Sequence, residues 1–327
     1  MDSSVVLKEV ELAPPAAPKV GRAKINWRTH FQQHWPLYVM LIPAIVSMIL
    51  FRFYPMWGIL FAFKKYSPVA GFAKSPWVGL KNFSRFFSSD YALPILRNTI
   101  SIAVGKIVVG QIVAILFALF LNEVRSHFFK RTVQTMTTLA HFLSWIIIGG
   151  MMVQILSTKG AVNQIVTSFG LEPIRFLSDP AVFPWTLIGL ETWKEFGWGA
   201  VIYLAALTNI NPELYEAAAV DGADRFQRMR HITLPGIKTL IILMSCLSLG
   251  GILSAGFEQV LVLYNPVVYK TGDILDTYIY RVGLVGSGGM PDYSLGTAVG
   301  LLQGGVGFVL ILVSYWLADK FANYRVF

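Results

Sequence analysis

The sequence has a single cysteine and few charged side chains for its 327 residues. Cys246 lies inside an apolar run, and without a second cysteine the chain can form neither a disulfide framework nor a paired-thiol metal or redox motif. We interpret it as a packed small apolar side chain. Charged residues make up 14% of the chain, against about 25% in an average soluble domain, and apolar types make up 55%. This composition predicts a polytopic membrane protein.

Motifs for nucleotide, metal and covalent chemistry are missing as well. No G-x-x-x-x-G-K-[ST] phosphate loop occurs, because "VGKIVVG" lacks both the spacing and the Ser or Thr. The histidines lack the spacing of metal ligands, and no motif indicates a Ser-His-Asp arrangement. They are His30, His34, His127, His141 and His231. We therefore expect no catalytic residue, no metal and no bound cofactor in this chain.

The formal net charge of +9 would suggest a nucleic-acid partner in a soluble protein. In a membrane protein it more often reflects basic ends that face the cytosol and anionic lipid. It also gives weak support for an acidic solute. We therefore expect membrane lipid, and no nucleic acid, among the partners.

Long apolar runs dominate the chain. A spanning helix needs about 20 mostly apolar residues, because the hydrocarbon core is about 30 Å thick and each residue rises about 1.5 Å. Backbone groups find no water in lipid, so helices are the expected form for such runs. Six segments qualify: 36–61, 98–121, 132–156, 183–207, 237–263 and 294–317. We predict an all-α protein with a cytosolic tail and interfacial segment at 1–35, a six-helix transmembrane domain at 36–320 and a cytosolic tail at 321–327.

Positive charge does not settle the orientation of these spans. With the N-terminus in the cytosol, most basic residues near span ends would be cytosolic, as the positive-inside rule requires. The first loop would nevertheless place five on the opposite side: Lys64, Lys65, Lys74, Lys81 and Arg85. Another observation must decide the orientation.

The stretch "EAAAVDGADRFQRMRHITLP", residues 216–235, is charged where its surroundings are apolar. Just upstream, Asn211 and Pro212 predict a helix start, because Asn caps free amides and Pro lacks an amide that would be orphaned there. Gly222 permits a left-handed turn, and Pro235 is expected to stop a second short helix. We predict a helix-Gly-helix element on the membrane face, acidic first and basic second. A solvated amphipathic loop is the alternative.

The spacing of this stretch resembles the EAA loop of the permease subunits of bacterial ABC importers. The matching positions are Glu216, Ala217, Ala218, Gly222, Ile232, Leu234 and Pro235. In that family the loop is the coupling helix, which docks into a cleft of a separate ATP-hydrolysing subunit. The coupling residues that the resemblance implies here are Glu216, Ala217, Ala218, Ala219, Asp221 and Gly222. The 209–236 loop would then be cytosolic and, with four spans before it, so would both termini.

Further motifs resemble the polysaccharide-type branch of carbohydrate importers, which is related to the maltose permeases. They are "WVGLKNF" (77–83), "RNT" (97–99), "ALFLNEV" (118–124), "HFLSW" (141–145) and "WKEFGWGAVIYLAAL" (193–207). Ala140 stands where this branch usually has Pro, so the usual cause of a kink in the third span is absent. The sequence is similar to the permease subunit of an importer for alginate or similar acidic oligosaccharides.

The resemblance also implies an assembly. Permeases of this kind work in the bacterial inner membrane with a second permease subunit, two ATP-binding subunits that hold ATP and Mg, and a periplasmic or lipid-anchored solute-binding protein. The chain would form half of the translocation path for an oligosaccharide or polysaccharide. It would be a transport subunit and not an enzyme.

Ionisable side chains inside spans cost about 2.5 to 3.5 kcal/mol on insertion scales, so they usually face a bundle interior or a wet cavity. Lys106, Lys194, Glu195 and Glu258 lie inside predicted spans, and tryptophans beside Lys194 and Glu195 offer faces on which sugar rings stack. The path residues that we predict are Trp193, Lys194, Glu195, Trp198, Glu258 and Gln259. A mutual or snorkelling pair near the membrane surface is the alternative for Lys194 and Glu195.

The end of the chain carries two further features. Gly296, Gly300 and Gly304 share one face of the last span, where another backbone can approach closely. We predict helix packing there, within this chain or with a partner permease. The segment 264–293 is long for a connection and would face outside. Its Tyr, Asp and Arg content suits either a solute-binding protein or a flexible structural loop.

Two other function classes stay open at this point. An ion-coupled secondary sugar transporter would use Glu258 or Glu195 as a proton site, and it would leave the 216–235 stretch unexplained. A membrane-embedded enzyme acting on lipid-linked sugars would need a concentrated polar site at an interface, which the sequence does not indicate.

Overall fold

The computed structural model describes residues 27–286 and 290–322, so most of the tail predicted at 1–35 and most of that at 321–327 lie outside the described residues. The described residues are largely helical and hold no β-strand, only an isolated antiparallel bridge between Lys64 and Trp77. The all-α prediction is confirmed. The chain divides after Trp57 into two units.

The first unit is a single apolar helical run. It comprises α1 (Trp27–Met48), the π-helical η1 (Ile49–Phe53) and the start of the 3₁₀-helical η2 (Tyr54–Phe63). Met40 and Phe51 are each 77% exposed, and exposed apolar side chains occur from Phe31 to Trp57. A helix that is apolar on every side is typical of a membrane span. The segment His34–Phe63 is long and apolar enough for one.

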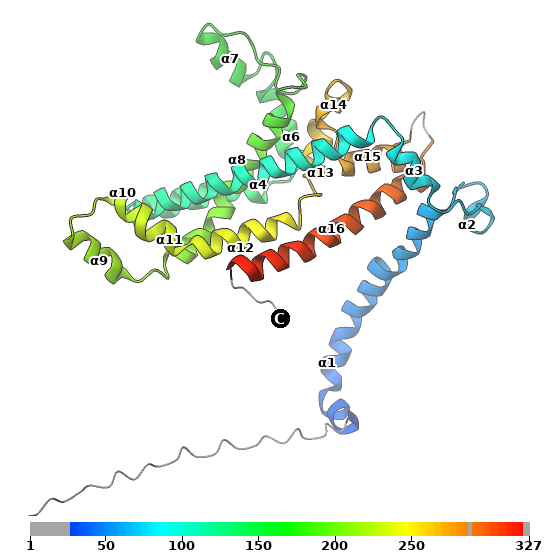
Figure 1. Cartoon of the computed structure of the whole chain (residues 1–327), viewed down its shortest axis with the longest axis horizontal. Helices are drawn as coiled ribbons and strands as arrows, with labels where there is room; N and C mark the ends of the chain where they lie inside the picture. Colours follow the sequence, from blue (N-terminus) through cyan, green and yellow to red (C-terminus); the bar gives the residue numbers. More distant parts are fainter. Residues whose placement is uncertain (1–26, 287–289, 323–327) are drawn as a thin grey trace, which may run out of the picture. The chain divides into compact units, whose positions relative to one another are not determined.

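The second unit contains the remaining helices. In chain order they are α2 (Gly71–Lys74), α3 (Lys81–Phe87), α4 (Ala92–Glu123), α5 (His127–Leu139), η3 (Ala140–Phe142), α6 (Trp145–Ile155), α7 (Ala161–Ser168), α8 (Phe183–Leu207), α9 (Pro212–Val220), α10 (Arg225–Arg228), η4 (Met229–Thr233), α11 (Leu234–Gly236), α12 (Lys238–Leu249), α13 (Phe257–Leu263), η5 (Pro266–Val268), α14 (Tyr269–Gly272), α15 (Leu275–Tyr280), η6 (Arg281–Val285) and α16 (Tyr293–Ala322). Within this unit α9 and α10 lie at one end, and α14 and α15 lie at the other (Figure 1).

Two long helix pairs form the framework of this unit. α4 packs along α8, and α12 packs along α16. A small residue allows the close contact of α4 with α8: a Cβ added at Gly105 of α4 would lie 2.4 Å from Ile188 Cδ1 of α8. The buried side chains Ala118, Leu204 and Ile237 belong to a core between α4, α8 and the start of α12. The framework therefore joins the two ends of the unit by straight, closely packed helices.

The six predicted spans are not confirmed as six. Among the described residues, three helices are long and apolar enough to cross a membrane, or up to five if each of two bent helix pairs counts as one span. α8 has 25 residues but contains Glu191, Lys194 and Glu195. Charges inside a spanning helix require partners inside the protein, and the partners of these three are described below.

The third predicted span, 132–156, is broken. α5–η3 and α6 are bent by 102° across the break. There Leu143 and Ser144 are extended, and the Ser144 hydroxyl accepts a hydrogen bond from the Ile146 N–H at 3.2 Å. Because Ser144 caps α6, the kink forms with Ala at position 140 and needs no proline.

The fifth predicted span, 237–263, is wrong as a single helix. α12 ends at Leu249, and α13 begins only after Gly256, whose φ of 88° is left-handed. Within the break, the Ala255 carbonyl accepts a hydrogen bond from Lys106 Nζ at 2.6 Å. The Lys106 ammonium thus supplies the hydrogen bond that a continuous helix would have given this carbonyl. Such a partner inside the protein permits non-helical backbone at membrane depth.

Candidate functional site

The 209–236 loop folds as two helices joined by a left-handed glycine. The Asn211 side chain accepts the Glu213 N–H at 3.0 Å, so Asn211 caps α9 as predicted. Gly222 has a φ of 80°, which strains any other residue type. Asp224 starts α10 with a capping box: the Gln227 N–H donates to its carboxylate at 2.7 Å, and its own N–H donates to the Gln227 side chain at 2.8 Å. Local signals therefore specify both helix starts.

The second helix ends beside Pro235, as predicted: the helical run from Arg225 stops at Gly236, one residue after the proline, and is bent by 55° from Lys238–Leu249. The chain continues from α10 through the π-helix η4 into α11, which ends at Gly236. The Leu234 N–H bonds to the Met229 carbonyl five residues back, so the hydrogen-bond ladder has already shifted before the proline. A proline is tolerated at this point because its missing N–H has no α-helical partner to lose.

α9 exposes both its charged and its apolar side chains. None of its residues is buried; Leu214 is 52% exposed and Val220 is 89% exposed. Phe226 on α10 is 68% exposed. The Tyr215 hydroxyl lies 3.0 Å from Thr233 Oγ1, which ties α9 to η4. An apolar patch on an otherwise charged surface is typical of a protein interaction site.

The residues of the EAA-like spacing occupy one continuous element. Glu216, Ala217, Ala218 and Ala219 lie on α9, Asp221 and Gly222 lie in the turn, Ile232 lies on η4, and Leu234 and Pro235 lie on α11. Glu216 and Ala217 are exposed, whereas Ala218 is half-buried. The EAA-like positions thus include exposed surface of α9 and the turn at Gly222 that sets the angle between α9 and α10.

A first charged cluster, the His141 cluster, joins η3 to α8. Glu195 contacts Lys194 Nζ at 2.7 Å and His141 Nδ1 at 2.6 Å, using one carboxylate oxygen for each. Lys194 is 6% exposed, and its ammonium also donates to the His141 carbonyl at 2.8 Å. The His141 ring stacks on Trp198 with centroids 4.6 Å apart. Lys194 and Glu195 therefore pair with each other, as in the alternative to the predicted path role, and His141 is a third partner.

A second charged cluster, the Lys106 cluster, joins α4, α8 and the break before α13. Lys106 Nζ lies 3.6 Å from the Glu191 carboxylate and donates to the side-chain carbonyl of Gln259. Gln259 is fully buried, and its amide donates to the Leu187 carbonyl at 2.8 Å. A Cβ added at Gly256 would lie 2.5 Å from Lys106 Nζ. Glycine at this position therefore leaves the space that the ammonium occupies.

Sequence reasoning missed Glu191. It lies four residues before Glu195 on α8, and this spacing puts both carboxylates on one side of the helix. Together with Lys106, which also lies within a predicted span, the spacing was the signal that could have found it. The partner assignment itself required the tertiary structure, because Lys106 and Glu191 are 85 positions apart in the sequence and meet only when α4 packs against α8.

The two clusters border a common hollow of about 240 Å³ between α4, α8 and α12. Lys106 and Glu195 both line it, as do Gln111, Tyr203 and Ser248. Gln111 donates to the Tyr203 hydroxyl at 3.1 Å. The volume lies below the roughly 300 Å³ at which small-molecule pockets begin. A saccharide would therefore need additional walls from another subunit.

The predicted path residues do not all lie together. Lys194, Glu195 and Trp198 belong to the His141 cluster, and Gln259 belongs to the Lys106 cluster. Trp193 and Glu258 are exposed, and neither lines the hollow. Among the described residues, no three His, Cys, Asp or Glu side chains gather as metal ligands would.

The three glycines of α16 have different surroundings. A Cβ added at Gly296 would lie 2.7 Å from the Gly283 Cα of η6, so α16 and η6 touch backbone to backbone there. At Gly300 the nearest atom would be a side-chain carbon of Ile279 at 3.9 Å, and at Gly304 nothing lies within 4 Å. The glycine face thus packs within this chain at its N-terminal end and is open farther along.

The crowded surroundings of Gly296 and the open surroundings of Gly304 allow a matched test of protein stability. We expect Gly296→Ala to lower the free energy of unfolding by about 1 to 3 kcal/mol, because the methyl group would overlap backbone that cannot rotate away. Gly304→Ala adds the same methyl group to open space and should leave stability unchanged or raise it by up to about 1 kcal/mol, because alanine is the better helix former. Thermal unfolding of both variants in detergent measures the difference. Equal melting temperatures would contradict the close contact at Gly296.

The described parts of the segment 264–293, residues 264–286 and 290–293, contain several short helices. They include η5, α14, α15 and η6, and Ile274 and Leu275 are buried. Arg281 pairs with the Asp273 carboxylate and lies over the Tyr269 ring at 4.6 Å. Burial raises the pKa of the Asp273 carboxyl above its ordinary value, and the Arg281 guanidinium opposes that shift. The segment therefore presents a shaped surface at the end of the unit remote from α9.

Comparisons with known proteins agree on one family. Residues 106–323 match the family described as "Binding-protein-dependent transport system inner membrane component". Protein LplB of Bacillus subtilis (strain 168) is 40% identical over 313 residues, which cover 95% of this chain and 97% of the relative. The polygalacturonan/rhamnogalacturonan transport system permease protein YteP of the same organism is 40% identical over 292 residues, or 89% of this chain and 90% of the relative.

Two solved structures have the same fold. A chain of a bacterial ABC transporter involved in the import of the acidic polysaccharide alginate is 36% identical, with a TM-score of 0.81 over 90% of this chain and 99% of that one. A chain of the bacterial alginate ABC transporter in complex with an alginate pentasaccharide-bound periplasmic protein is also 36% identical. Its TM-score is 0.80 over 91% of this chain and 99% of that one.

Proposed function

The chain belongs to the family of binding-protein-dependent transport system inner membrane components, and from this premise we propose that it imports an acidic oligosaccharide and couples that import to ATP hydrolysis by a separate subunit. Membership makes it a multi-pass inner-membrane permease of a sugar ABC transporter, a transport component and not an enzyme. The substrate, the coupling and the partners are the parts that we propose.

The exposed α9–Gly222–α10 element is the observation that carries the coupling proposal. Its Leu214, Val220 and Phe226 side chains are more than half exposed and available to a cleft of an ATP-binding subunit. Two such subunits would hold ATP and Mg, and this chain would bind neither. The element would be cytosolic, which places both termini in the cytosol.

The proposed cycle is alternating access. ATP binds the closed pair of ATP-binding subunits more tightly than the open pair, and only such a difference in affinity can shift the permease between states. Closure would move α9 and α10, and the packed helices α4, α8 and α12 would tilt outward. A second permease subunit would supply the opposite wall of the path.

The proposed acidic substrate would bind at Lys106, which lies on the wall of the hollow between α4, α8 and α12 together with Glu195. A carboxylate-bearing sugar would compete with Glu191 for the ammonium of Lys106. Trp198 stacks on His141, which contacts Glu195. The path role of Trp193, Lys194, Glu195, Trp198, Glu258 and Gln259 stays a prediction. Relatives named for polygalacturonan/rhamnogalacturonan and for the acidic polysaccharide alginate point the same way.

The segment 264–293 would receive a solute-binding protein. It lies at the end of the second unit opposite α9 and α10 (Figure 1), which is the outer end if the coupling element is cytosolic. The similar alginate transporter has been solved with a periplasmic protein bound to its saccharide.

Substrate-stimulated ATP hydrolysis in proteoliposomes tests the proposal. The chain is reconstituted with its partner permease, ATP-binding subunits and solute-binding protein. We expect an acidic oligosaccharide such as a trimer of galacturonate to stimulate hydrolysis several-fold and a neutral oligosaccharide of equal length to do so weakly. Equal stimulation would contradict the acidic substrate. Uptake that needs an ion gradient and no ATP would instead favour a secondary transporter.

A further inference from the structure

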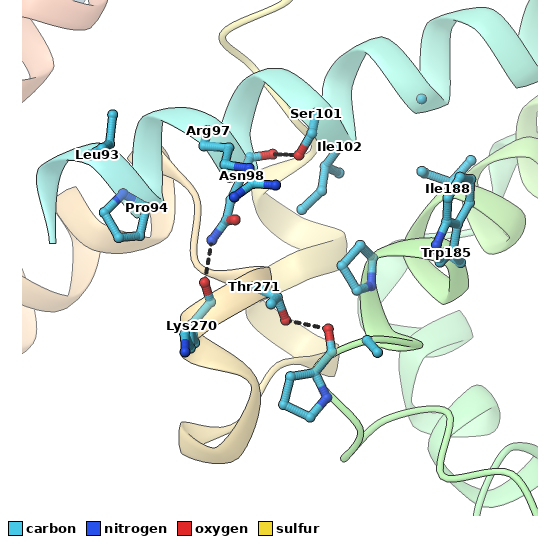
Figure 2. A pocket seen from close by; sticks show the side chains of 14 residues that line it. Leu93, Pro94, Arg97, Asn98, Ser101, Ile102, Trp185, Ile188, Lys270 and Thr271 are labelled. Atoms are coloured by element: carbon cyan, nitrogen blue, oxygen red, sulfur yellow. Dashed lines mark hydrogen bonds between the residues drawn. The ribbon is translucent and has the colours of Figure 1, made fainter.

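A second, larger hollow of about 600 Å³ lies where α4 and α8 begin, beside α14 (Figure 2). It shares no residue with the hollow described above. Figure 2 shows Arg97 on α4 and Lys270 on α14 toward one side of it, with Trp185 and Ile188 toward the other. The proposed path uses none of these residues.

Both charged residues that line this hollow are cations. Arg97 and Lys270 are exposed, and no acidic side chain lines the hollow with them. In the described part of the chain, no salt bridge joins either cation to a carboxylate. The hollow therefore carries an uncompensated positive charge, which favours an anionic ligand.

The polar side chains around the hollow already have backbone partners. Asn98 donates to the Lys270 carbonyl at 3.0 Å, Ser101 donates to the Asn98 carbonyl at 3.2 Å, and Thr271 donates to the Pro180 carbonyl at 2.6 Å (Figure 2). A saccharide needs several polar groups for its hydroxyls. The hollow instead offers two cations and an otherwise apolar wall, so it suits an amphiphile better than a sugar.

Arg97 lies near the start of α4, at a depth that suits contact with a lipid headgroup. Arg97 is five residues from the start of α4 at Ala92, which at 1.5 Å per residue is about 7 to 8 Å along the helix. Trp185 lies two residues after the start of α8 and is 69% exposed, and Leu93 is 77% exposed. Exposed tryptophan near the end of a membrane helix is typical of the bilayer interface.

We propose that this hollow binds one anionic phospholipid, with its phosphate against Arg97 and Lys270 and an acyl chain along Leu93 and Trp185. Arg and Lys side chains bind phosphate oxygens through charge-assisted hydrogen bonds. Binding requires only this chain's own residues. The leaflet is the outer one if the proposed orientation of α9 and α10 holds, but the lipid site does not depend on transport.

Native mass spectrometry of the complete importer, purified in detergent, tests the site. Phosphatidylglycerol and phosphatidylcholine of equal chain length are titrated in turn. We expect one phosphatidylglycerol to bind tightly and phosphatidylcholine to bind at least tenfold more weakly. The double variant Arg97→Gln/Lys270→Gln should lose about fivefold in phosphatidylglycerol affinity per cation, about 25-fold in total. Arg97→Lys/Lys270→Arg should retain it, because both charges remain.

The matched control is Lys159→Gln/Arg175→Gln, which removes two exposed cations between α6 and α8 that do not line the hollow. It should leave phosphatidylglycerol binding unchanged. Equal binding of the two lipids, or equal loss in both double variants, would overturn the proposal. So would displacement of the lipid by galacturonate trimer, which would assign the hollow to the saccharide, or tight binding of glycerol phosphate alone, which would make it a simple anion site. The readout is lipid occupancy, so a failed transport assay would not affect it.

Discussion

Gly222→Val is expected to lower substrate-stimulated ATP hydrolysis of the reconstituted importer more than tenfold. Gly222 has a φ of 80°, and a β-branched residue in the left-handed region costs at least about 1 to 2 kcal/mol. Space is not the constraint, since a Cβ there meets no atom within 4 Å. The backbone would relax, and α10 would leave the turn in another direction. α9 and α10 could then no longer dock together on an ATP-binding subunit.

Gly170→Val is the matched control for this experiment. Gly170 has a φ of 78°, also lies in open space and follows α7, far along the chain from the 209–236 loop. It incurs the same backbone strain, but hydrolysis should remain stimulated. Gly222→Asn should recover much of the loss, because Asn enters the left-handed region more readily than Val. If Gly222→Val and Gly170→Val behave alike, the turn has no special part in coupling.

Glu216→Ala tests the surface of α9 without altering its backbone. Glu216 is exposed, and alanine is a strong helix former, so α9 should persist. Reduced stimulation with intact assembly would place the carboxylate at the contact with the ATP-binding subunit. Full stimulation in both Glu216→Ala and Gly222→Val would leave the α9–α10 element a surface loop and would contradict the proposed coupling.

Lys106→Met is expected to lower both the stability of the protein and its preference for an acidic substrate, and the two effects can be measured separately. Removing the ammonium leaves Glu191 without its cation and Gln259 without a donor, and breaking a buried ion pair costs about 3 kcal/mol or more. It also removes a cation from the wall of the 240 Å³ hollow. Because a hydrogen bond to a charged group contributes about 1.5 to 3 kcal/mol, the preference for acidic over neutral oligosaccharide should fall about tenfold or more.

Two variants separate these effects. Lys106→Met/Glu191→Met removes both charges and should recover most of the stability, because no lone charge remains, but it should not recover the acidic preference. Lys64→Met removes another buried lysine, whose ammonium donates to the Phe72 carbonyl at 2.8 Å away from the hollow. It should reduce stability and leave selectivity intact. An acidic preference that survives in Lys106→Met would exclude Lys106 from substrate recognition.

The helix starts of the 209–236 loop could be predicted because their causes are local. Asn211 caps α9 through the second residue after it, and the Asp224 cap also acts within three residues. Gly222 adopts the left-handed conformation because it has no Cβ, which is also a local cause. The end of the second helix beside Pro235 was predictable for the same reason, whereas the π-helical η4 just before it was not, because no local cap or glycine marks its shifted hydrogen bonds.

The break in the fifth predicted span shows the opposite case, whereas the break in the third span has the local Ser144 cap. The fifth segment is apolar enough to span, and its length and hydropathy alone favour a continuous helix. At the break before α13, Lys106, more than a hundred residues earlier, reaches the Ala255 carbonyl and occupies the space that Gly256 leaves. No pattern within the segment itself reveals such a partner.

The sequence by itself determined the all-helical membrane class, the resemblance to importer permeases and the two helices around Gly222, because composition, fixed spacing and capping act over a few residues. The tertiary structure alone decided which charges meet. Lys106 pairs with Glu191, Glu195 joins His141 to Lys194, and Arg97 and Lys270 gather at an apolar hollow. These contacts link residues distant in the chain, and charge interactions depend on the distance and burial that only packing sets.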